Sequence, residues 1–439
     1  MVLKIKAIGG YGEFGKNMTY IEVNGKIILL DIGIHLDNYI TFMEDHEGLA
    51  PTVEELIEVG AVPDVFLFKE RFNDVIAIIP SHAHFDHVFA APYLIKFFPN
   101  AKVYASPYTT QFILNMFRQE NKEIPTIITQ DCNSRFKINK DITIEFIYVT
   151  HSIPHTVMIC VETKEGRFLY TNDYKFDDAP VIGPKSNIKR LEELSPFKAI
   201  IVDSTRAVFP GTTKTEVEVR EMLFNEVEKI NNDARSIFIL TFSSQLQRLK
   251  TIKDVAKRVG REAVFLGRSL AKYIYAAHDI KLTKIAPKQN IAQFPNKIRR
   301  ILKMVSENPK KYIIVTTGHQ GEPTANLCKI VDGILDYPLK NDDWIIFSCT
   351  VIPNPVSVQN RKILESKLAQ KKVNILKDIH ASGHASHDEI KKLIEVTKPE
   401  FIFPSAADKP FEQEVAKIAK SINYNNSIIL EIGKEHIFE

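Results

Sequence analysis

The stretch Ser81-His82-Ala83-His84-Phe85-Asp86-His87 decides how the rest of the chain is interpreted. Just before it, residues 75–80 form an apolar, β-branched run that predicts a buried strand. Just after it, residues 88–98 are mostly apolar and predict a buried helix. We therefore expect the cluster on a strand-to-helix turn at the carboxyl end of a strand, where open α/β sheets place their ligands.

Three histidines and one aspartate within six residues form a set of metal-ligating side chains. Imidazole and carboxylate are donors that suit Zn²⁺ or Mn²⁺. His82 and His84 can point to one side of an extended turn, while Asp86 and His87 can face a second ion. The alternative is an ordinary polar surface, and we favour metal binding because four ligand-type side chains share a turn of the right kind. The stretch could supply half the ligands of a two-metal hydrolytic site.

Two further strands end in residues that complete such a site. Residues 142–149 alternate as a strand and run into His151, and residues 168–170 run into Asp173. Either residue alone would be weak evidence. Together with the cluster, His151 supplies another imidazole and Asp173 a carboxylate able to bridge two ions.

Two other aspartates also end apolar strands. Asp31 ends the strand 27–31, where it either orients a metal-ligating histidine or closes an ordinary turn. Asp203 ends the buried strand 199–203. The glycine-rich loop 9–16 is not a phosphate loop, because it lacks the Gly-Lys-Ser/Thr ending and leads into a strand. Residues 36–74 are acidic, and we expect them to be irregular.

Composition fits an ordinary globular protein with a large core. The 439 residues correspond to two or three domains of about 150 residues. The net charge of +3 neither requires nor excludes a nucleic-acid partner. The four cysteines form no CxxC pair, which indicates free thiols in a reducing compartment. No signal peptide is evident and no apolar run approaches about 18 residues, so we expect a cytoplasmic protein without membrane spans.

The chain from about residue 206 to residue 355 predicts a parallel α/β series without metal-type clusters. Small polar residues follow its strands, among them Ser243, Ser244 and the turn 317–323. We expect Ser243 or Ser244 to cap a helix from Leu246 to Val259, with Gly260 at its end and Pro323 in the first turn of another helix. Such helix starts can hold phosphates, or they can be the plain capping that any α/β domain needs.

A second histidine-rich segment follows the predicted strand 374–379. Ser386 and Glu389 predict a capping box for the next helix. His380, Ser382 and His384 lie on the turn before that helix. This combination is suited to phosphate, and its histidines offer a general acid near neutral pH.

Together these motifs resemble those of the β-CASP metallo-β-lactamase nucleases. The resemblance lies in residues 82–87, His151, Asp173, residues 203–205 and residues 380–384. Within that group, the chain is similar to the ribonuclease J family in residues 267–269, 317–323 and 347–353. The similarity spans nearly the whole chain.

The resemblance implies an α/β fold with two domains. A metallo-β-lactamase αββα sandwich would comprise residues 1–206 and 356–439, with a β-CASP α/β domain inserted as residues 207–355. It implies a two-metal phosphodiesterase that hydrolyses single-stranded RNA, mainly as a 5′-to-3′ exonuclease and with endonuclease activity as a second mode. Two divalent ions would be the cofactors, Zn²⁺ or alternatively Mn²⁺, and we expect a homodimer.

The resemblance also implies roles for individual residues. Asp203 and His384 would be catalytic together with Asp86, with His384 protonating the leaving oxygen and Asp203 orienting it. The implied metal ligands are His82, His84 and His151 for the first ion, Asp86 and His87 for the second, and Asp173 between them. The implied phosphate and RNA contacts are Ser243, Ser244, Gly318, His319, Gln320, His380, Ser382, Gly383 and His384. Separately from the resemblance, Phe14, Tyr174 and Phe242 are candidates for base stacking, although we expect most aromatic residues of this chain to lie in the core.

Two positions depart from the family pattern. Ala406 stands where the last family motif has a metal-binding histidine, so the second ion would bind weakly, use water or Asp408, or be absent. Asn172 stands where the family has glycine, and we expect it to change only loop geometry. Ala406 motivates an alternative function, an impaired protein that binds RNA without cutting it. A third alternative is a hydrolase of small thioesters or lactams on the same metal core.

Overall fold

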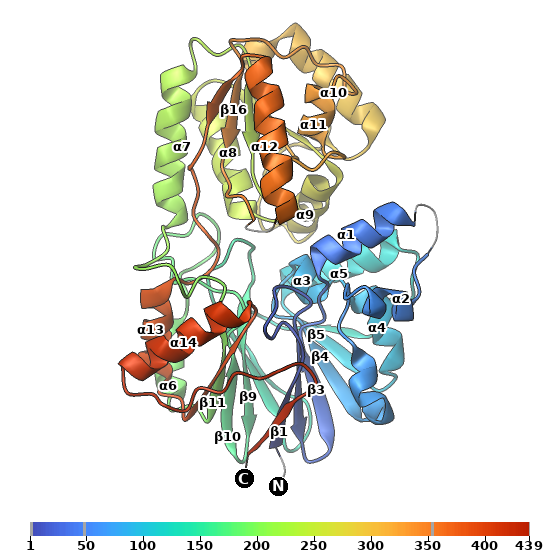
Figure 1. Cartoon of the computed structure of the whole chain (residues 1–439), viewed down its shortest axis with the longest axis vertical. Coiled ribbons are helices and arrows are strands. Elements are labelled where there is room, and N and C mark those ends of the chain that lie inside the picture. Colours follow the sequence, from blue (N-terminus) through green and yellow to red (C-terminus); the bar gives the residue numbers. More distant parts are fainter. Residues whose placement is uncertain (1–2, 47–49, 353–354, 439) are drawn as a thin grey trace. The chain divides into compact units, whose positions relative to one another are not determined.

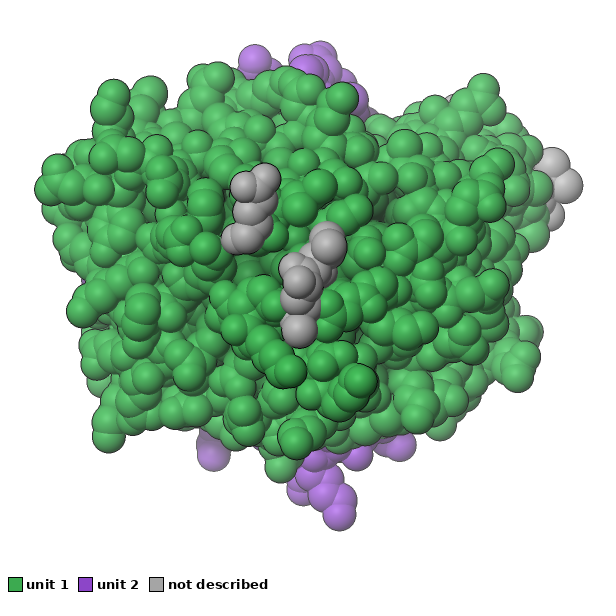
Figure 2. Space-filling model, turned by 90° about the horizontal axis from the view of Figure 1, so that it is seen from below, with its two compact units in different colours: residues 1–178, 184–213, 383–439 green, residues 179–183, 214–382 purple. Residues whose placement is uncertain are grey.

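The computed structural model describes residues 3–46, 50–352 and 355–438. The chain forms two compact units. Unit 1 contains residues 1–178, 184–213 and 383–439, and unit 2 contains residues 179–183 and 214–382. Figure 2 shows unit 1 as one continuous body although its residues come from three segments of the chain.

Unit 1 is built on two mixed β-sheets. In the first sheet, β3 to β6 run parallel, and the strands before them in the order pair antiparallel. Its seven strands, in order across the sheet, are β19 (Glu435–Phe438), β1 (Leu3–Gly9), β2 (Met18–Val23), β3 (Lys26–Leu30), β4 (Val75–Ile79), β5 (Lys102–Ala105) and β6 (Ile127–Thr129). The six strands of the second sheet are β18 (Phe401–Ser405), β11 (Ala199–Asp203), β10 (Gly166–Tyr170), β9 (Val157–Thr163), β8 (Thr143–Tyr148) and β7 (Arg135–Lys137).

The two sheets of unit 1 pack face to face. Alternate residues of each strand, such as Ile28 and Phe146, point into one buried cluster shared by both sheets. The other face of the second sheet is covered by α6 (Ile188–Leu194), α13 (His387–Thr397) and α14 (Lys409–Ser421), as Figure 1 shows. The remaining helices of unit 1 are α1 (Leu36–Asp45), α2 (Val53–Glu58), η1 (Val65–Asp74), α3 (Phe85–Val88), α4 (Ala91–Leu94), η2 (Ile95–Phe97) and α5 (Pro107–Gln119). This arrangement is the expected αββα sandwich.

Unit 2 contains a third sheet whose six strands are all parallel. In order they are β14 (Ile291–Ala292), β13 (Glu262–Leu266), β15 (Tyr312–Thr316), β12 (Ile237–Leu240), β16 (Trp344–Phe347) and β17 (Asn374–Leu376). One face of this sheet is covered by α10 (Pro295–Glu307), α11 (Asn326–Val331) and α12 (Pro355–Gln370). The other helices are α7 (Glu216–Ile230), α8 (Leu246–Arg258), α9 (Arg268–Asp279), η3 (Lys288–Asn290) and η4 (Pro309–Lys311).

The divide between the units differs from the boundaries expected from sequence. The inserted domain was expected to end at residue 355, but unit 2 continues to Ser382. The reason is that β17 pairs in parallel with β16, with Ile375 opposite Ile345, and that α12 packs on the third sheet. The tertiary pairing of this strand, which its sequence does not reveal, therefore assigns residues 356–382 to unit 2.

Two local predictions in unit 1 were wrong. The helix expected over residues 88–98 is broken into α3, α4 and η2. Pro92 explains the break, because it has no N–H to donate to the carbonyl of Val88. The segment 36–74 was expected to be irregular, but its described residues contain α1, α2 and η1.

Helix ends in unit 2 were only partly anticipated. Gln245, not Ser243 or Ser244, is the N-cap residue of α8. Gly260 has the positive φ of +74° that a residue just past a helix end adopts, as expected. Pro323 lies in the turn before α11, which begins only at Asn326. In unit 1, the capping box of Ser386 and Glu389 is confirmed.

Gly33 holds the histidine-rich turn close to the end of β3. A Cβ atom at this position would overlap the carbonyl oxygen of Asp86 and lie 2.6 Å from the backbone nitrogen of His87. The close approach lets Ile32 N–H donate to the His87 carbonyl at 2.8 Å and Ile34 N–H donate to the Phe85 carbonyl at 3.1 Å. Only glycine permits this backbone contact.

We predict that Gly33→Ala lowers the free energy of unfolding by about 3 kcal/mol, because two backbones must separate to admit one methyl group. The same shift should displace Asp86 and His87 and reduce the metal bound per chain. Denaturant unfolding and metal analysis measure both effects. Gly25→Ala is the control: its hairpin position has open space, so only the positive φ should cost about 1 kcal/mol. Equal losses in the two variants would contradict this account of Gly33.

Candidate metal centre

Three histidines and one aspartate converge at the carboxyl ends of the unit 1 strands. His82 and His84 follow β4, His151 follows β8, and Asp173 follows β10. His82 Nε2 lies 3.0 Å from His84 Nδ1, which lies 3.1 Å from His151 Nε2. The Asp173 carboxylate is 3.5 Å from His82 Nε2 and 3.6 Å from His151 Nε2. These ligand atoms, all within 4.8 Å of one another, can hold one metal ion.

The outer nitrogen of each of these rings has a polar partner. Ser81 Oγ lies 3.0 Å from His82 Nδ1, and Ser152 Oγ lies 3.2 Å from His84 Nε2. His151 Nδ1 donates to the Gly383 carbonyl at 2.7 Å. These contacts fix the rings so that the other nitrogen of each points to the centre, which is the orientation that metal-binding histidines need.

Burial keeps this first set of imidazoles neutral. It lowers the pKa of His82 and of His84 well below the ordinary value, and it lowers the pKa of His151 to about 4. A neutral imidazole has a free lone pair, which is the form that binds a metal. The donor set therefore fits a divalent ion such as Zn²⁺.

A second set of possible ligands shares Asp173 with the first. His87 Nε2 lies 3.4 Å from Asp173 Oδ2 and 3.3 Å from Asp86 Oδ2. Burial lowers the pKa of His87, but three nearby carboxylates, led by Asp173, outweigh it and raise the pKa well above its ordinary value. A proton on His87 and a bound cation are therefore two alternative ways to offset the negative charge of these carboxylates.

Asp31 orients His87 of this second set by accepting from the ring nitrogen that does not face Asp173 and Asp86. Its Oδ2 accepts from His87 Nδ1 at 2.6 Å and from the Tyr170 hydroxyl at 2.7 Å. Its Oδ1 accepts from the backbone N–H of Ser81 at 2.6 Å. Of the two interpretations left open by the sequence, the geometry supports a residue that orients His87.

Asn17 was missed by sequence reasoning. Its Nδ2 lies 3.1 Å from His87 Nε2 and 3.3 Å from Asp86 Oδ2. It stands just before β2, after the glycine-rich loop, where no histidine or acidic residue is adjacent to mark it as part of a metal site. A Cβ at Gly10 would clash with the Asn17 side chain, so the glycines of this loop serve close packing beside the candidate ligands.

His384 and Asp203 form a pair beside the bridging carboxylate. His384 Nδ1 donates to Asp203 Oδ2 at 2.8 Å, and His384 Nε2 lies 3.9 Å from Asp173 Oδ2. Burial lowers the pKa of His384, but Asp173 and Asp203 outweigh it and raise the pKa to about 9. The ring is therefore held in one orientation with a proton available on Nε2, as a general acid requires.

Gly383 packs closely against His151. Its carbonyl accepts from His151 Nδ1 at 2.7 Å, while its expected contact with phosphate stays a prediction. A Cβ at Gly383 would come within 2.6 Å of His151 Cε1. Glycine is needed here because the imidazole lies against the backbone.

The two positions that depart from the family pattern both have left-handed backbones. Ala406 has φ +63° and follows Ser405, which pairs with Asp203, so it stands at the same sheet edge as the candidate ligands. Its N–H donates to the Gly10 carbonyl at 2.6 Å. Asn172 has φ +46°, which asparagine tolerates better than most residues, and its side chain donates to the Val157 carbonyl at 2.6 Å. This explains why asparagine can replace glycine at position 172.

The expected phosphate-binding turns of unit 2 meet at the carboxyl edge of the third sheet. Ser243 and Ser244 follow β12, Gly318, His319 and Gln320 follow β15, and His380 and Ser382 follow β17. The Phe242 ring lies 4.5 Å from the His319 ring and 6.1 Å from the His380 ring, measured between centroids. Buried Arg248 of α8 joins the residues that follow β16 and β17, since it donates to Ser348 Oγ at 2.6 Å and to the Ile379 carbonyl at 3.3 Å.

Two of the residues expected to contact RNA, His319 and Tyr174, have little access to a ligand. His319 is 8% exposed, and burial with nearby Arg361 lowers its pKa to about 3. A neutral, buried imidazole is a weak phosphate ligand. Tyr174 was expected to stack on bases but is fully buried in the core of unit 1, so that expectation was wrong. Residue 353, the last of the motif 347–353, lies outside the described residues.

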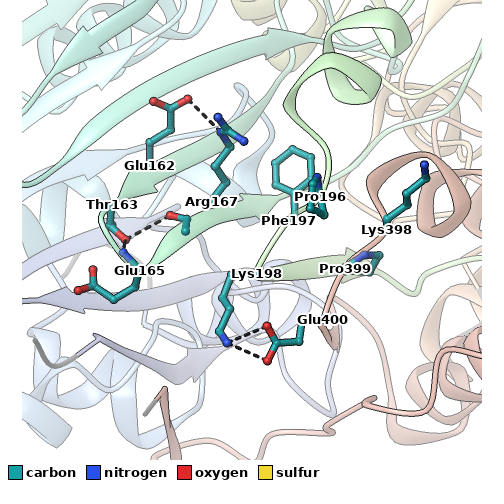
Figure 3. Close-up of a pocket in the computed structure, with 11 residues that line it drawn as sticks. Glu162, Thr163, Glu165, Arg167, Pro196, Phe197, Lys198, Lys398, Pro399 and Glu400 are labelled. Atoms are coloured by element: carbon teal, nitrogen blue, oxygen red, sulfur yellow. Dashed lines mark hydrogen bonds and ion pairs between the residues drawn. The ribbon is translucent and has the colours of Figure 1, made fainter.

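A hollow of about 530 Å³ lies at the opposite end of the second sheet (Figure 3). It is lined by residues that precede or begin β10, β11 and β18, such as Gly166, Lys198 and Glu400. Lys198 and Glu400 form an ion pair at 2.7 Å, and Arg167 lies 3.5 Å from Glu162. The candidate ligands follow the other ends of these strands, so the hollow is separate from the metal centre.

None of the helices formed by the described residues has the length and apolar character needed to cross a membrane.

Comparisons with known proteins agree with the geometry. Residues 11–212 match a family model of the metallo-beta-lactamase superfamily, and residues 234–365 match one described as ribonuclease J, beta-CASP domain.

Known relatives cover nearly the full chain. The chain is 35% identical over 438 residues to "Ribonuclease J" of Pyrococcus abyssi, a match covering 99% of this chain and 95% of the relative. It is 36% identical over 430 residues to "Ribonuclease J" of Methanocaldococcus jannaschii, covering 97% and 95% respectively. A crystal structure of a protein of unknown function from Enterococcus faecalis has the same fold, with a TM-score of 0.71 at 15% identity and full coverage of both chains. The chain belongs to the ribonuclease J family, whose fold is a metallo-β-lactamase domain with a β-CASP insertion.

Proposed function

We propose that this protein is a metal-dependent ribonuclease that hydrolyses single-stranded RNA, mainly from the 5′ end, with endonuclease activity as a second mode. The observation that carries the proposal is the convergence of two possible metal-ligand sets on one buried carboxylate, Asp173. Beside it stands His384, oriented by Asp203 at 2.8 Å. Membership of the ribonuclease J family supports RNA as the substrate.

The proposed ligands are those expected from the sequence. Two divalent ions, Zn²⁺ or alternatively Mn²⁺, would supply an activated water and neutralise charge on the phosphate. His82, His84 and His151 would hold one ion, Asp86 and His87 the other, and Asp173 would lie between them. Asp31 and Asn17 would keep His87 and Asp86 in place.

Proton transfer would fall to this chain's own residues. His384 Nε2 would give its proton to the leaving oxygen of the phosphodiester, and Asp203 would stabilise the imidazolium beforehand. The turns at the carboxyl edge of the third sheet would bind RNA phosphates through backbone N–H groups and side-chain hydroxyls. Phe242 is better placed than Tyr174 to stack on a base, because Phe242 is only half-buried and lies beside His319 and His380.

Ala406 supports a second candidate function. Alanine cannot ligate a metal, so the second set lacks the ligand that the family motif places there. A protein that binds RNA without cutting it would be consistent with this loss. The ligand sets argue for an enzyme, because six possible ligands of the two ions remain in place, Asp173 among them. Hydrolysis of small thioesters or lactams would not need the phosphate-type turns of unit 2.

We also expect a cytoplasmic homodimer.

The first test uses a 5′-monophosphorylated, 3′-labelled single-stranded RNA with Mn²⁺ or Zn²⁺. We expect the protein to release mononucleotides from the 5′ end, and a chelator to stop the release. Ala406→His should bind the second ion more tightly and cut faster, since histidine tolerates the positive φ at this position. Cutting by the histidine variant alone would mean that this chain is a disabled form. RNA binding by both forms without cutting would replace the nuclease by the binding function.

A second test removes the shared carboxylate. Asp173→Asn should lower metal affinity more than about 100-fold. Even a change to a residue that only hydrogen-bonds to a metal ligand lowers metal affinity about 10- to 100-fold. Metal content per chain after dialysis measures this loss, and cutting should fall with it. Asp178→Asn is the control, since this exposed carboxylate lies outside the ligand sets. Unchanged metal content in Asp173→Asn would refute the shared-ligand proposal.

A third test separates proton transfer from metal binding. His384→Gln should lower the rate of cutting by about 10²- to 10⁴-fold, which is the usual contribution of a general acid. Bound metal and RNA affinity should stay the same, as measured by metal analysis and by binding with a chelator present. His387→Gln, three residues along the chain, should change none of the three. Loss of metal in His384→Gln would make this residue a ligand rather than an acid.

A further inference from the structure

One segment of unit 2 carries far more positive charge than the chain as a whole. Between residues 281 and 311 there are nine lysines and arginines and one glutamate, whereas the whole chain has 57 basic and 54 acidic residues. The segment comprises η3, the edge strand β14, α10 and η4. Eight of its nine cationic side chains are exposed, and only Lys297 is half-buried. We call this surface, residues 281–311, the basic flank.

Helix α10 gives the basic flank its form. Ile298, Ile301, Leu302 and Val305 face the third sheet and are buried. The opposite side of the helix exposes Arg299, Arg300 and Lys303. Arg299 and Lys303 are four residues apart and Arg300 and Lys303 three apart, so their side chains are neighbours on one helix face. In Figure 1, α10 lies at the margin of its unit, beside α11.

Few acids neutralise these charges. Among the residues that the structure describes, the basic flank has one ion pair, between Lys311 and Glu262 at 3.9 Å. Burial and the charge of Arg300 lower the pKa of Lys297, which shows that the cations are close enough to repel one another. Like charges three or four residues apart destabilise a helix. The fold therefore bears a cost that a polyanionic ligand would relieve.

The basic flank extends away from the turns that we propose bind phosphate. Those turns follow the strands at the carboxyl edge of the third sheet. Helix α10 starts at that edge, just after β14, and runs back toward the edge where β15 begins. Lys310 and Lys311 immediately precede β15, and Lys288 begins the short helix η3 that leads into β14, so they stand at the amino edge. Exposed cations thus continue from one edge of the sheet to the other.

An exposed aromatic side chain accompanies the charges. Phe294, the residue before α10, is 62% exposed. Exposed aromatic rings beside cations are typical of surfaces that bind single-stranded nucleic acid, since bases stack on the rings while cations follow the backbone. This pairing favours RNA over other polyanions, such as an anionic lipid surface.

We propose that the basic flank is an accessory RNA-binding surface, which holds the phosphodiester backbone of a long single-stranded RNA outside the phosphate-binding turns. This inference rests on the proposed function, because it concerns the same substrate. Short RNAs would be cut without using the basic flank. Long RNAs would bind more tightly because of it, with a strong dependence on salt.

The test compares the full chain with the variant Arg299→Gln, Arg300→Gln, Lys303→Gln. Binding of a fluorescent oligouridine of about 40 nucleotides is measured with a chelator present, between about 50 and 200 mM salt. Loss of three phosphate contacts at about 0.7 each should lower the slope of log K against log salt by about 2. At 0.1 M salt, that slope corresponds to about 100-fold weaker binding. Cutting of an oligomer of about five nucleotides with Mn²⁺ should remain unchanged.

A matched control removes the same net charge elsewhere. Lys102, Lys140 and Lys164 are exposed lysines of unit 1, and their joint change to Gln should leave the slope and the affinity as they were. The thermal midpoint of the Arg299, Arg300 and Lys303 variant without RNA should not fall, because the change removes repulsion. This second readout separates lost binding from lost folding.

Each other outcome has a definite meaning. Equal loss of RNA binding in both triple variants would overturn the inference, since net charge alone would explain it. Unchanged RNA binding with lost binding to phosphatidylglycerol vesicles would overturn it in favour of a lipid surface. If the unaltered protein binds long RNA through the basic flank but cuts no RNA, the proposed nuclease function fails while the inference stands.

Discussion

The buried carboxylate of Asp31 is the interaction on which the candidate site depends. It accepts hydrogen bonds from the Ser81 backbone, His87 Nδ1 and the Tyr170 hydroxyl. These three donors come from the ends of β4 and β10 and from the histidine-rich turn, while Asp31 itself follows β3. One carboxylate thus ties the first sheet to the second exactly where the possible ligands gather. A buried carboxyl group is tolerated only when its oxygens have hydrogen-bond partners, and here several donors supply them.

Close backbone packing makes this arrangement possible. Glycines 10, 33 and 383 stand where a Cβ would strike Asn17, the Asp86 backbone and the His151 ring respectively. Each contact brings a ligand-bearing turn nearer to its neighbours than a larger residue would allow. The fold of unit 1 therefore brings histidines and carboxylates together in one buried place, although like charges repel there and burial removes their hydration. The pKa values of His82 and His87, shifted in opposite directions, are the electrostatic result.

Unit 2 divides its chemistry between two kinds of surface. At the carboxyl edge of its sheet, Arg248 and the neighbouring turns form a buried hydrogen-bond network that fixes backbone positions. Along the basic flank, cations are exposed and few are paired. The first surface is suited to a phosphate held in a defined geometry. The second is suited to a flexible polyanion, because exposed charges attract without demanding one orientation.

The sequence by itself determined the fold class, the ligand types and most of the candidate residues. Ligand side chains directly after apolar strands, at His82, His151 and Asp173, mark strand ends, which is where α/β sheets place their ligands. The packing of the first sheet on the second then brings them together, since His82 follows β4 and the other two follow β8 and β10. Tertiary structure alone decided the rest. Asn17 became part of the site, and Tyr174 was buried, through contacts between residues distant in the chain. Strand β17 joined the sheet of unit 2 because hydrogen bonds to β16, not its own residues, decide its place. Local patterns report which face or end of an element is polar, but only packing decides which distant element meets it.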